Sequence, residues 1–306
     1  MIFDSFGDYI FYDGAMGTML QKYGLKRGER PDVMNITAPG SVESVHRLYI
    51  EAGSDIICTN SFGCNQEALK QTGYSPEEVI FAAVSIAKQA RNAAPADGSP
   101  SAAERQDKQT GAAGRVKIAL DIGPTGVLID PLGDLEYDQA VEIFARQAIA
   151  GEKAGADFAA VETMSDLTEL KAAIVAVVKY TKLPVLATMT FDKSGRTFLG
   201  CNPEDFAKTA ESHGAAAVGL NCSLAPAEMF DTAERIAKAT ELPLIVKPNA
   251  GLPDPVSGEY SISPEEFARQ MELFKKIGVR IVGGCCGTTP EYIRVLRETF
   301  TGRSSL

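Results

Sequence analysis

The chain has 306 residues, of which 45% are hydrophobic and 23% charged, and its formal net charge is −10. These proportions are typical of a globular protein with a sizeable core. The acidic balance argues against nucleic acid and anionic membrane surfaces as partners, because both attract clustered Lys and Arg. No apolar run approaches the roughly 20 residues that a membrane-spanning helix needs. We therefore expect no nucleic-acid partner and no membrane partner.

The beginning of the chain and its cysteines indicate a compartment. Residues 1–12 contain Asp4 and Asp8 and no basic residue, unlike a secretory signal peptide. Six cysteines in a chain without such a signal are expected to be thiols, metal ligands or nucleophiles rather than disulfides. The sequence thus predicts a cytoplasmic protein.

A short apolar run that ends in a polar or glycine residue recurs along the chain, alternating with longer segments of helical spacing. Several runs are almost continuously apolar, which is typical of parallel strands covered by helices on both faces. The predicted strands are 10–13, 55–60, 116–123, 157–163, 184–190, 216–222, 243–249 and 279–286. The predicted helices are 40–52, 76–91, 138–153, 166–180, 203–213, 226–240, 264–277 and 290–300.

Eight strand–helix units in a chain of this length predict an α/β fold, a (β/α)8 TIM barrel that forms a single domain over residues 1–306. The alternative is a doubly wound open sheet. That fold usually has a glycine-rich dinucleotide turn after its first strand, and residues 13–18 lack the required spacing. Residues 92–114 are rich in small and polar residues, so we expect a flexible surface insertion at the bottom of the barrel.

Catalytic groups of a TIM barrel come from the C-terminal ends of its strands. In this sequence the predicted strand ends are far more polar than the runs that precede them, and they contain three of the six cysteines. The residues at these ends are Asp13, Asn60, Asp121, Glu162, Thr190, Asn221, Cys222, Asn249, Cys285 and Cys286.

Cys222, Cys285 and Cys286 are candidate metal ligands. Successive side chains of a regular strand point to opposite faces, so the adjacent pair converges only if the backbone bends, which its flanking glycines permit. Three thiolates at one point suit Zn²⁺ with a fourth position left open, as in catalytic zinc sites. Two other interpretations stay open on the residues alone: small core cysteines, and a vicinal pair that forms a disulfide or redox switch.

Two further features suggest recognition of an amino acid. The backbone amides of residues 13–18 can hold a carboxylate, or the segment is simply a tight glycine turn. Glu162 can pair with a substrate ammonium group, or it can form a salt bridge with a Lys or Arg of the barrel. The first interpretation of each, joined to a thiol-binding metal, describes a site for a small amino acid that carries a thiol. We assign no role to Cys58, Cys64, Cys201, His46 and His213.

Seven segments spread over nearly the whole chain carry a resemblance to a known family. They are residues 13–18 (DGAMGT), 59–63 (TNSFG), 121–126 (DIGPTG), 189–192 (MTFD), 219–223 (GLNCS), 248–251 (PNAG) and 283–290 (GGCCGTTP). The chain resembles the homocysteine S-methyltransferase family, most closely the branch that includes the homocysteine-binding barrel of cobalamin-dependent methionine synthase. The double cysteine with its upstream Asn-Cys is the most specific of these motifs.

The resemblance implies a TIM barrel in which Cys222, Cys285 and Cys286 hold Zn²⁺. It implies that the homocysteine thiolate becomes the fourth ligand and attacks an activated methyl group, so that the product is methionine. We further expect the side-chain oxygen of Asn249, at the end of the seventh predicted strand, to fill the fourth metal position before substrate binds.

The resemblance also implies where the rest of homocysteine lies. The substrate's amino group is expected near Glu162 and the carbonyl of Asp13. Its carboxylate is expected at the turn amides of Gly14 and Ala15. No catalytic residue beyond the zinc site is implied.

The methyl donor is the open part of this prediction. The sequence contains no Asp-x-His-x-x-Gly corrinoid signature and its length leaves no room for a second domain, so we expect methylcobalamin on a separate corrinoid protein. One alternative is a small donor such as betaine or S-methylmethionine, or another thiol as acceptor. A second is a non-catalytic zinc- or thiol-binding module that serves a corrinoid protein. A metal-free barrel, such as a phosphate-binding lyase, is the weakest alternative.

Overall fold

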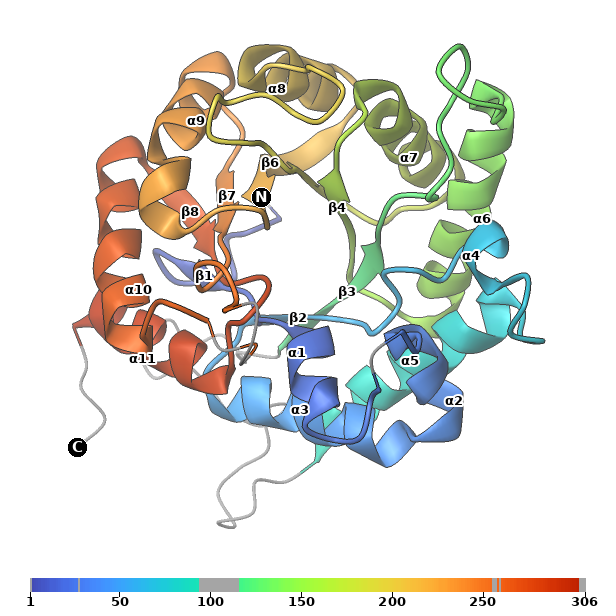
Figure 1. The fold of residues 1–306 in the computed structure, drawn as a ribbon, viewed down its shortest axis with the longest axis horizontal. Coiled ribbons are helices and arrows are strands. Elements are labelled where there is room, and N and C mark those ends of the chain that lie inside the picture. The colour runs from blue at the N-terminus through green and yellow to red at the C-terminus, as the bar shows by residue number, and fades with distance from the viewer. Residues whose placement is uncertain (1, 27, 94–115, 255–257, 259, 303–306) are drawn as a thin grey trace.

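Eight parallel strands form a ring in the computed structural model, and the helices surround this ring (Figure 1). The structure describes residues 2–26, 28–93, 116–254, 258 and 260–302. The strands are β1 (Ile10–Phe11), β2 (Ile56–Cys58), β3 (Lys117–Ile122), β4 (Phe158–Met164), β5 (Val185–Met189), β6 (Ala215–Asn221), β7 (Leu244–Lys247) and β8 (Val279–Val282). Each predicted strand is confirmed, and most are shorter than their apolar runs.

The strand order identifies a barrel rather than an open sheet. Hydrogen-bonded neighbours run in the order β1-β8-β7-β6-β5-β4-β3-β2. A parallel bridge between Tyr12 and Ile56 joins the two ends of this order. The Asp55 amide also donates to the Phe11 carbonyl at 2.7 Å across the same junction. The predicted (β/α)8 barrel is therefore confirmed, and the doubly wound alternative is excluded.

The larger helices lie where helical spacing predicts them, and polar caps fix several of their starts. Asn202 and Ser263 each accept a hydrogen bond from the third residue of the helix that follows. The helices are α1 (Met16–Gln21), α2 (Met34–Thr37), α3 (Pro39–Glu51), α4 (Gln66–Leu69), α5 (Pro76–Asn92), α6 (Tyr137–Ala154), α7 (Leu167–Tyr180), α8 (Pro203–Ser212), α9 (Pro226–Ala239), α10 (Pro264–Met271) and α11 (Pro290–Thr301), with 3-10 turns at Pro31–Val33 and Glu272–Ile277.

Two differences from the predicted elements concern the connections. Sequence reasoning missed α1, α2 and α4, because four to six residues are too few to show helical periodicity. The expected insertion at 92–114 lies almost wholly outside the described residues; Asn92 is the last residue of α5. No helix in the described ranges is long and apolar enough to cross a membrane.

The interior of the barrel has two layers of different chemistry. We call the lower, apolar layer the barrel floor; there Phe3 from the N-terminal segment stacks on Phe158 with ring centroids 6.1 Å apart. The floor comprises Phe3, Ile10, Ile56, Ala119, Phe158, Ala160, Leu186, Ala217, Ile245 and Ile281. The barrel mouth is the polar layer at the C-terminal strand ends, and comprises Asp13, Asp121, Glu162, Asn221, Lys247, Asn249 and the three cysteines Cys222, Cys285 and Cys286.

Candidate metal and substrate site

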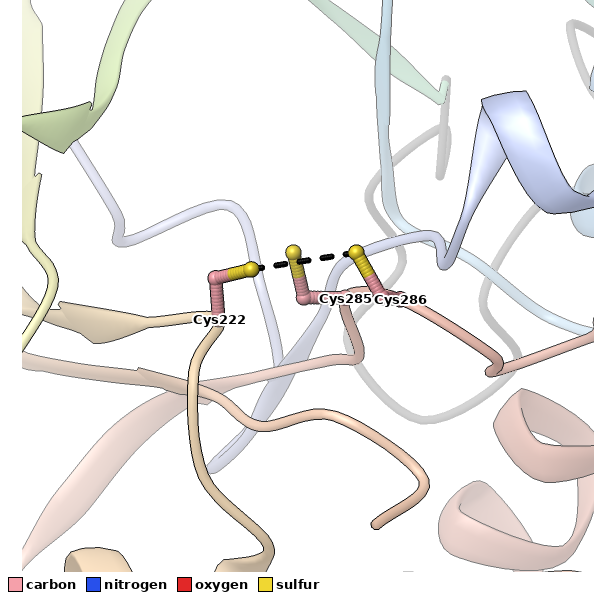
Figure 2. Close-up of side chains that lie close together, drawn as sticks. All are labelled: Cys222, Cys285 and Cys286. Atoms are coloured by element: carbon pink, nitrogen blue, oxygen red, sulfur yellow. Dashed lines mark hydrogen bonds between the residues drawn. The ribbon is translucent and has the colours of Figure 1, made fainter. Parts of the chain in front are cut away.

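Three thiols from two strand ends meet in the barrel mouth. Figure 2 shows Cys222, at the end of β6, pointing toward Cys285 and Cys286, which follow β8. Their three sulfur atoms all lie within 4.8 Å of one another, and those of Cys222 and Cys286 are 3.7 Å apart. Zn–S bonds of about 2.3 Å in a tetrahedron place sulfurs roughly 3.8 Å apart, so this spacing fits a zinc ion.

The backbone turns sharply to bring these sulfurs together. Cys222 and Ser223 adopt φ angles of +62° and +54°, a left-handed conformation that is rare for residues other than glycine. The amide of Cys222 donates to the carbonyl of Lys247 at 3.0 Å, and that of Cys285 donates to the carbonyl of Pro248 at 2.7 Å. Both cysteine segments are thus fixed to the end of β7, which runs between them.

The glycine before the cysteine pair acts differently from the expected hinge. A Cβ atom on Gly284 would lie 2.2 Å from Thr288 Oγ1, so glycine is needed there for close packing. The left-handed glycine of this loop is Gly287, directly after the pair, with φ +82°. The bend that brings Cys285 and Cys286 to one side therefore depends on close packing before the pair and a left-handed residue after it.

Asn221 connects the thiol cluster to two neighbouring strands. Its Oδ1 accepts from the Thr163 amide at 2.9 Å and from the Thr188 hydroxyl at 2.8 Å. Its Nδ2 donates to the Thr163 hydroxyl at 2.7 Å and to Cys285 Sγ at 3.8 Å. A fully buried amide with these partners fixes the orientation of Cys285.

Asn249 offers an oxygen beside the sulfurs. Its side chain lies within hydrogen-bonding reach of Cys222. Its Oδ1 is buried and has no hydrogen-bond partner in the described part of the chain. A buried polar atom without a partner is costly, and a metal ion held by the sulfurs would satisfy it. The donors at this point, three thiols and one amide oxygen, thus fit Zn²⁺.

The cluster favours negative charge on one sulfur. Hydrogen bonds from Cys285 and Cys286 lower the pKa of the Cys222 thiol well below its ordinary value. The same pairing with Cys222 raises the pKa of Cys285 and that of Cys286. One thiolate held between two thiols is the arrangement that a soft divalent cation would replace.

The loop after β1 approaches the loop after β8 closely. A Cβ atom on Gly14 would lie 2.6 Å from Thr288 Oγ1, which explains the glycine. The Ala15 amide donates to the Thr288 carbonyl at 3.0 Å, as does the Tyr49 hydroxyl at 2.8 Å. The Gly14 amide has no partner among the described residues. Of the two amides expected to hold the substrate carboxylate, one is therefore already bonded within the chain.

Asp13 contacts two neighbouring strand ends. Its Oδ2 accepts from the Cys58 amide at 2.8 Å, and its carbonyl accepts from the Gly284 amide at 3.1 Å. Burial raises the pKa of this carboxyl to about 7, and the nearby Glu162 adds to the rise while Lys247 opposes it. The carbonyl expected near the substrate's amino group keeps one lone pair free.

Glu162 forms a buried ion pair with Lys247. The Lys247 ammonium also lies 4.4 Å from the centroid of the Tyr12 ring, in a cation–π contact. The salt bridge to a barrel cation, one of the two interpretations of Glu162, is thus present. Sequence reasoning missed Lys247; its signal is a lone lysine at the end of an apolar strand, two residues after Ile245 of the barrel floor.

The other residues that the sequence singled out lie outside the three-sulfur cluster. Cys58, Cys64 and Cys201 are free thiols outside the three-sulfur cluster. Asn60 donates to the Pro31 carbonyl at 2.6 Å and ties two loops together. Asp121 lies near the end of β3, in the barrel mouth.

The fold and this site define a TIM-barrel protein with a thiol cluster at the ends of its sixth and eighth strands. A family model described as homocysteine S-methyltransferase matches residues 10–300, and the chain belongs to this family. It is 34% identical to a methionine synthase of Mycobacterium leprae over 296 residues. The aligned region covers 92% of this chain and 23% of the relative. A methionine synthase of Mycobacterium tuberculosis is 33% identical over 92% of this chain and 24% of the relative. The chain thus spans about a quarter of the length of these relatives.

Solved structures share the fold. The oxidised form of the homocysteine methyltransferase MmuM from Escherichia coli matches with a TM-score of 0.76 and 23% identity, over 97% of this chain and 99% of that one. Its metallated form matches with a TM-score of 0.74 and 23% identity over the same shares. At this level of identity the similarity establishes the barrel alone.

Proposed function

We propose that the chain, over residues 1–306, is a homocysteine-binding barrel domain that methylates homocysteine to methionine in a zinc-dependent reaction. The observation that carries this proposal is the convergence of three sulfurs, from the ends of β6 and β8, in a member of the homocysteine S-methyltransferase family. Their spacing and the unpartnered oxygen of Asn249 support Zn²⁺ as the ion. The free thiols of the chain support a cytoplasmic location.

Zinc in this site would hold a substrate thiol as thiolate at neutral pH, where a free thiol with a pKa of ~8.5 is mostly protonated. Cys222, Cys285 and Cys286 would hold the ion, and Asn249 Oδ1 would lie in the position that the substrate sulfur takes. Asn221 keeps Cys285 oriented through its bond to the sulfur. In this proposal the residues of the chain would fix where the substrate sulfur lies.

The polar groups around the sulfurs support an amino-acid substrate. The Gly14 amide is available to the carboxylate, and the Ala15 amide can join it by exchanging its bond to the Thr288 carbonyl. The carbonyl of Asp13 and the carboxylate of Glu162 would face the ammonium group. Held at both ends, homocysteine has few ways to place its sulfur, which favours attack on one donor geometry.

The methyl transfer itself is a nucleophilic displacement. A lone pair of the substrate sulfur forms the new S–C bond, and the bond from that carbon to the donor breaks with its electron pair remaining on the donor. The donor we propose is a corrinoid-bound methyl group held outside this barrel, as the sequence resemblance implies; the mycobacterial relatives are named methionine synthase, and the barrel matches about a quarter of their length. Betaine, S-methylmethionine and a non-catalytic role beside a corrinoid protein are the alternatives to this assignment.

Metal analysis tests the first half of the proposal. We expect one zinc per chain, with and without homocysteine, and loss of both the ion and methyl transfer in Cys285→Ser. Cys201→Ser is the matched control, because Cys201 is a half-buried thiol whose Sγ donates to the Asn202 carbonyl outside the cluster. A Cys285→Ser variant that keeps stoichiometric zinc and full activity would refute the proposal.

A donor screen tests the second half. The purified chain is supplied with homocysteine and, separately, methylcobalamin, betaine or S-methylmethionine, and methionine formation is measured. We expect homocysteine-dependent demethylation of free methylcobalamin. Activity with only a small donor would replace the corrinoid assignment, and a zinc-loaded chain that is inactive with all three would support the non-catalytic alternative.

A further inference from the structure

The barrel mouth holds more acidic groups than basic ones. Among the residues that the structure describes, Asp13, Asp121 and Glu162 lie there with one cation, Lys247, and each of the four influences the ionisation of another. Three carboxylates beside one ammonium leave the layer short of positive charge. In a buried layer that shortage is met by protons or by a bound cation.

Two of the three carboxylates are already engaged by the chain. Glu162 forms the buried ion pair with Lys247. Asp13 Oδ2 accepts from the Cys58 amide at 2.8 Å. A substrate ammonium group that approached Glu162 alone would meet a carboxylate already neutralised by a fixed lysine, which weakens the attraction.

Asp121 is the carboxylate without such a partner. Its Oδ1 is buried and accepts no hydrogen bond from the described residues. Its main chain is held on both sides, because the amide donates to Thr59 Oγ1 at 3.0 Å and the carbonyl accepts from the Ser61 hydroxyl at 2.8 Å. The side chain lies two residues beyond Ala119 of the barrel floor, so strand alternation directs it into the mouth.

Burial raises the pKa of Asp121 well above its ordinary value, and the nearby Glu162 adds to this rise. A cationic group beside the unpartnered oxygen would reverse both effects by supplying a charge-assisted hydrogen bond. Lys247 donates to Glu162 and makes no hydrogen bond to Asp121 Oδ1. The missing partner is therefore expected from a ligand.

We propose that Asp121 is a specificity-determining residue that binds the ammonium group of the substrate, while Lys247 holds Glu162 as an ion pair. The inference rests on the proposed function and deepens it, since it names the group that selects an amino thiol over a simple thiol acid. Glu162, already paired with Lys247, then attracts the ammonium group less strongly, and most of the substrate's positive charge is met by Asp121 together with the carbonyl of Asp13.

The test compares homocysteine with its des-amino analogue, 4-mercaptobutyrate, in the zinc-loaded chain. Asp121→Asn keeps the shape of the side chain and removes its charge. Loss of a hydrogen bond to a charged group corresponds to about a 10- to 100-fold weaker interaction, so we expect KM and the calorimetric Kd for homocysteine to rise by that factor. The values for 4-mercaptobutyrate and the kcat for homocysteine should change little.

Two variants serve as comparisons. Asp134→Asn removes an exposed carboxylate from the connection that follows β3 and leads to α6, and should change neither ligand's Kd. Glu162→Gln should reduce the preference for homocysteine less than Asp121→Asn does. If Asp121→Asn does not fold, Asp121→Ser is measured in its place, because serine is smaller and also uncharged.

The outcomes separate this inference from the proposed function. If the wild-type chain neither binds nor methylates homocysteine, the proposed function fails. If it does both and prefers homocysteine, but Asp121→Asn keeps that preference, only the role of Asp121 is overturned. A preference that disappears in Glu162→Gln and persists in Asp121→Asn would return the ammonium contact to Glu162.

Discussion

The two layers of the barrel interior come from the same strands, yet one is apolar and the other is polar and charged. In β7, Ile245 packs in the barrel floor, and Lys247, two residues further on, lies in the barrel mouth. In β4, Ala160 and Glu162 show the same change. One step of strand alternation thus separates a layer that can only stabilise the fold from a layer that can hold a ligand.

This difference shows that the barrel floor serves mainly to stabilise the fold, whereas the barrel mouth carries the groups that can bind a ligand. The floor removes apolar surface from water and leaves no polar side chain to satisfy. The mouth holds two buried carboxylates, a buried lysine, and a third carboxylate and three thiols that are partly buried, and such groups cost free energy unless they are paired. Substitutions in the floor should therefore change stability, whereas those in the mouth should change ligand binding or the dependence of stability on pH.

The largest effect on stability is expected in the floor, from Phe158→Ala. Removing this nearly buried ring, which stacks on Phe3, should lower the free energy of unfolding by about 3–5 kcal/mol. Chemical denaturation measures the change, and chelator competition on the folded variant measures zinc affinity. A fall in zinc affinity of the folded protein would contradict the separation of the two layers.

In the mouth, Asp13→Asn should change how stability depends on pH. The carboxyl has a pKa of about 7 in the folded chain and 3.8 as its ordinary value, so between these values the unfolded chain loses its proton first. Asp13 therefore makes the chain less stable as pH rises from 4 to 7, by about 4 kcal/mol in total. The difference in unfolding free energy between wild type and variant should show this slope, and a flat difference would refute it.

In the surrounding helices, His46 should make stability change with pH in the direction opposite to that of Asp13. His46 in α3 is fully buried, neither ring nitrogen has a partner in the described part of the chain, and burial lowers its pKa to about 4. Below the ordinary pKa of 6.5 the unfolded chain binds a proton at His46, whereas the folded chain does so only near pH 4. The free energy of unfolding should therefore fall by about 3 kcal/mol as the pH falls from 6.5 toward 4. His46→Leu should remove this loss in the same denaturation series.

Much of this organisation could be predicted from the sequence because it follows local patterns. Apolar runs marked all eight strands, and the polar residues after them marked the mouth. The three cysteines could be grouped because strand ends of a parallel barrel meet on one face. These predictions need only the period of the strand and the closure of the ring.

Other features depend on contacts that no local pattern contains. The pairing of Lys247 with Glu162 joins β7 to β4 across the barrel, and the sequence offered it only as one of two interpretations. The bond from Ala15 to the Thr288 carbonyl, which engages an expected substrate amide, likewise joins opposite ends of the chain. Left-handed angles at Cys222 and Ser223 could not be predicted either, because neither is a glycine.

Asn221 is a buried residue at the end of β6 whose side-chain amide reaches Cys285, a candidate metal ligand. Replacing it by Leu keeps the bulk and removes the bonds to Thr163 and Cys285. Loss of such a supporting contact weakens metal binding by about 10- to 100-fold. We therefore expect the zinc affinity of Asn221→Leu, measured by chelator competition, to fall by that factor, which equals about 1.4–2.7 kcal/mol.

Part of any loss in that variant can come from the freed Thr163 amide, and Thr188→Val provides the control. It removes only the hydroxyl that donates to Asn221 Oδ1 and leaves the bond to Cys285 Sγ intact. Its zinc affinity should stay near that of the wild type while its unfolding free energy falls by about 1 kcal/mol. Equal zinc affinities in both variants would show that Asn221 supports the fold of the mouth and does not orient the sulfur.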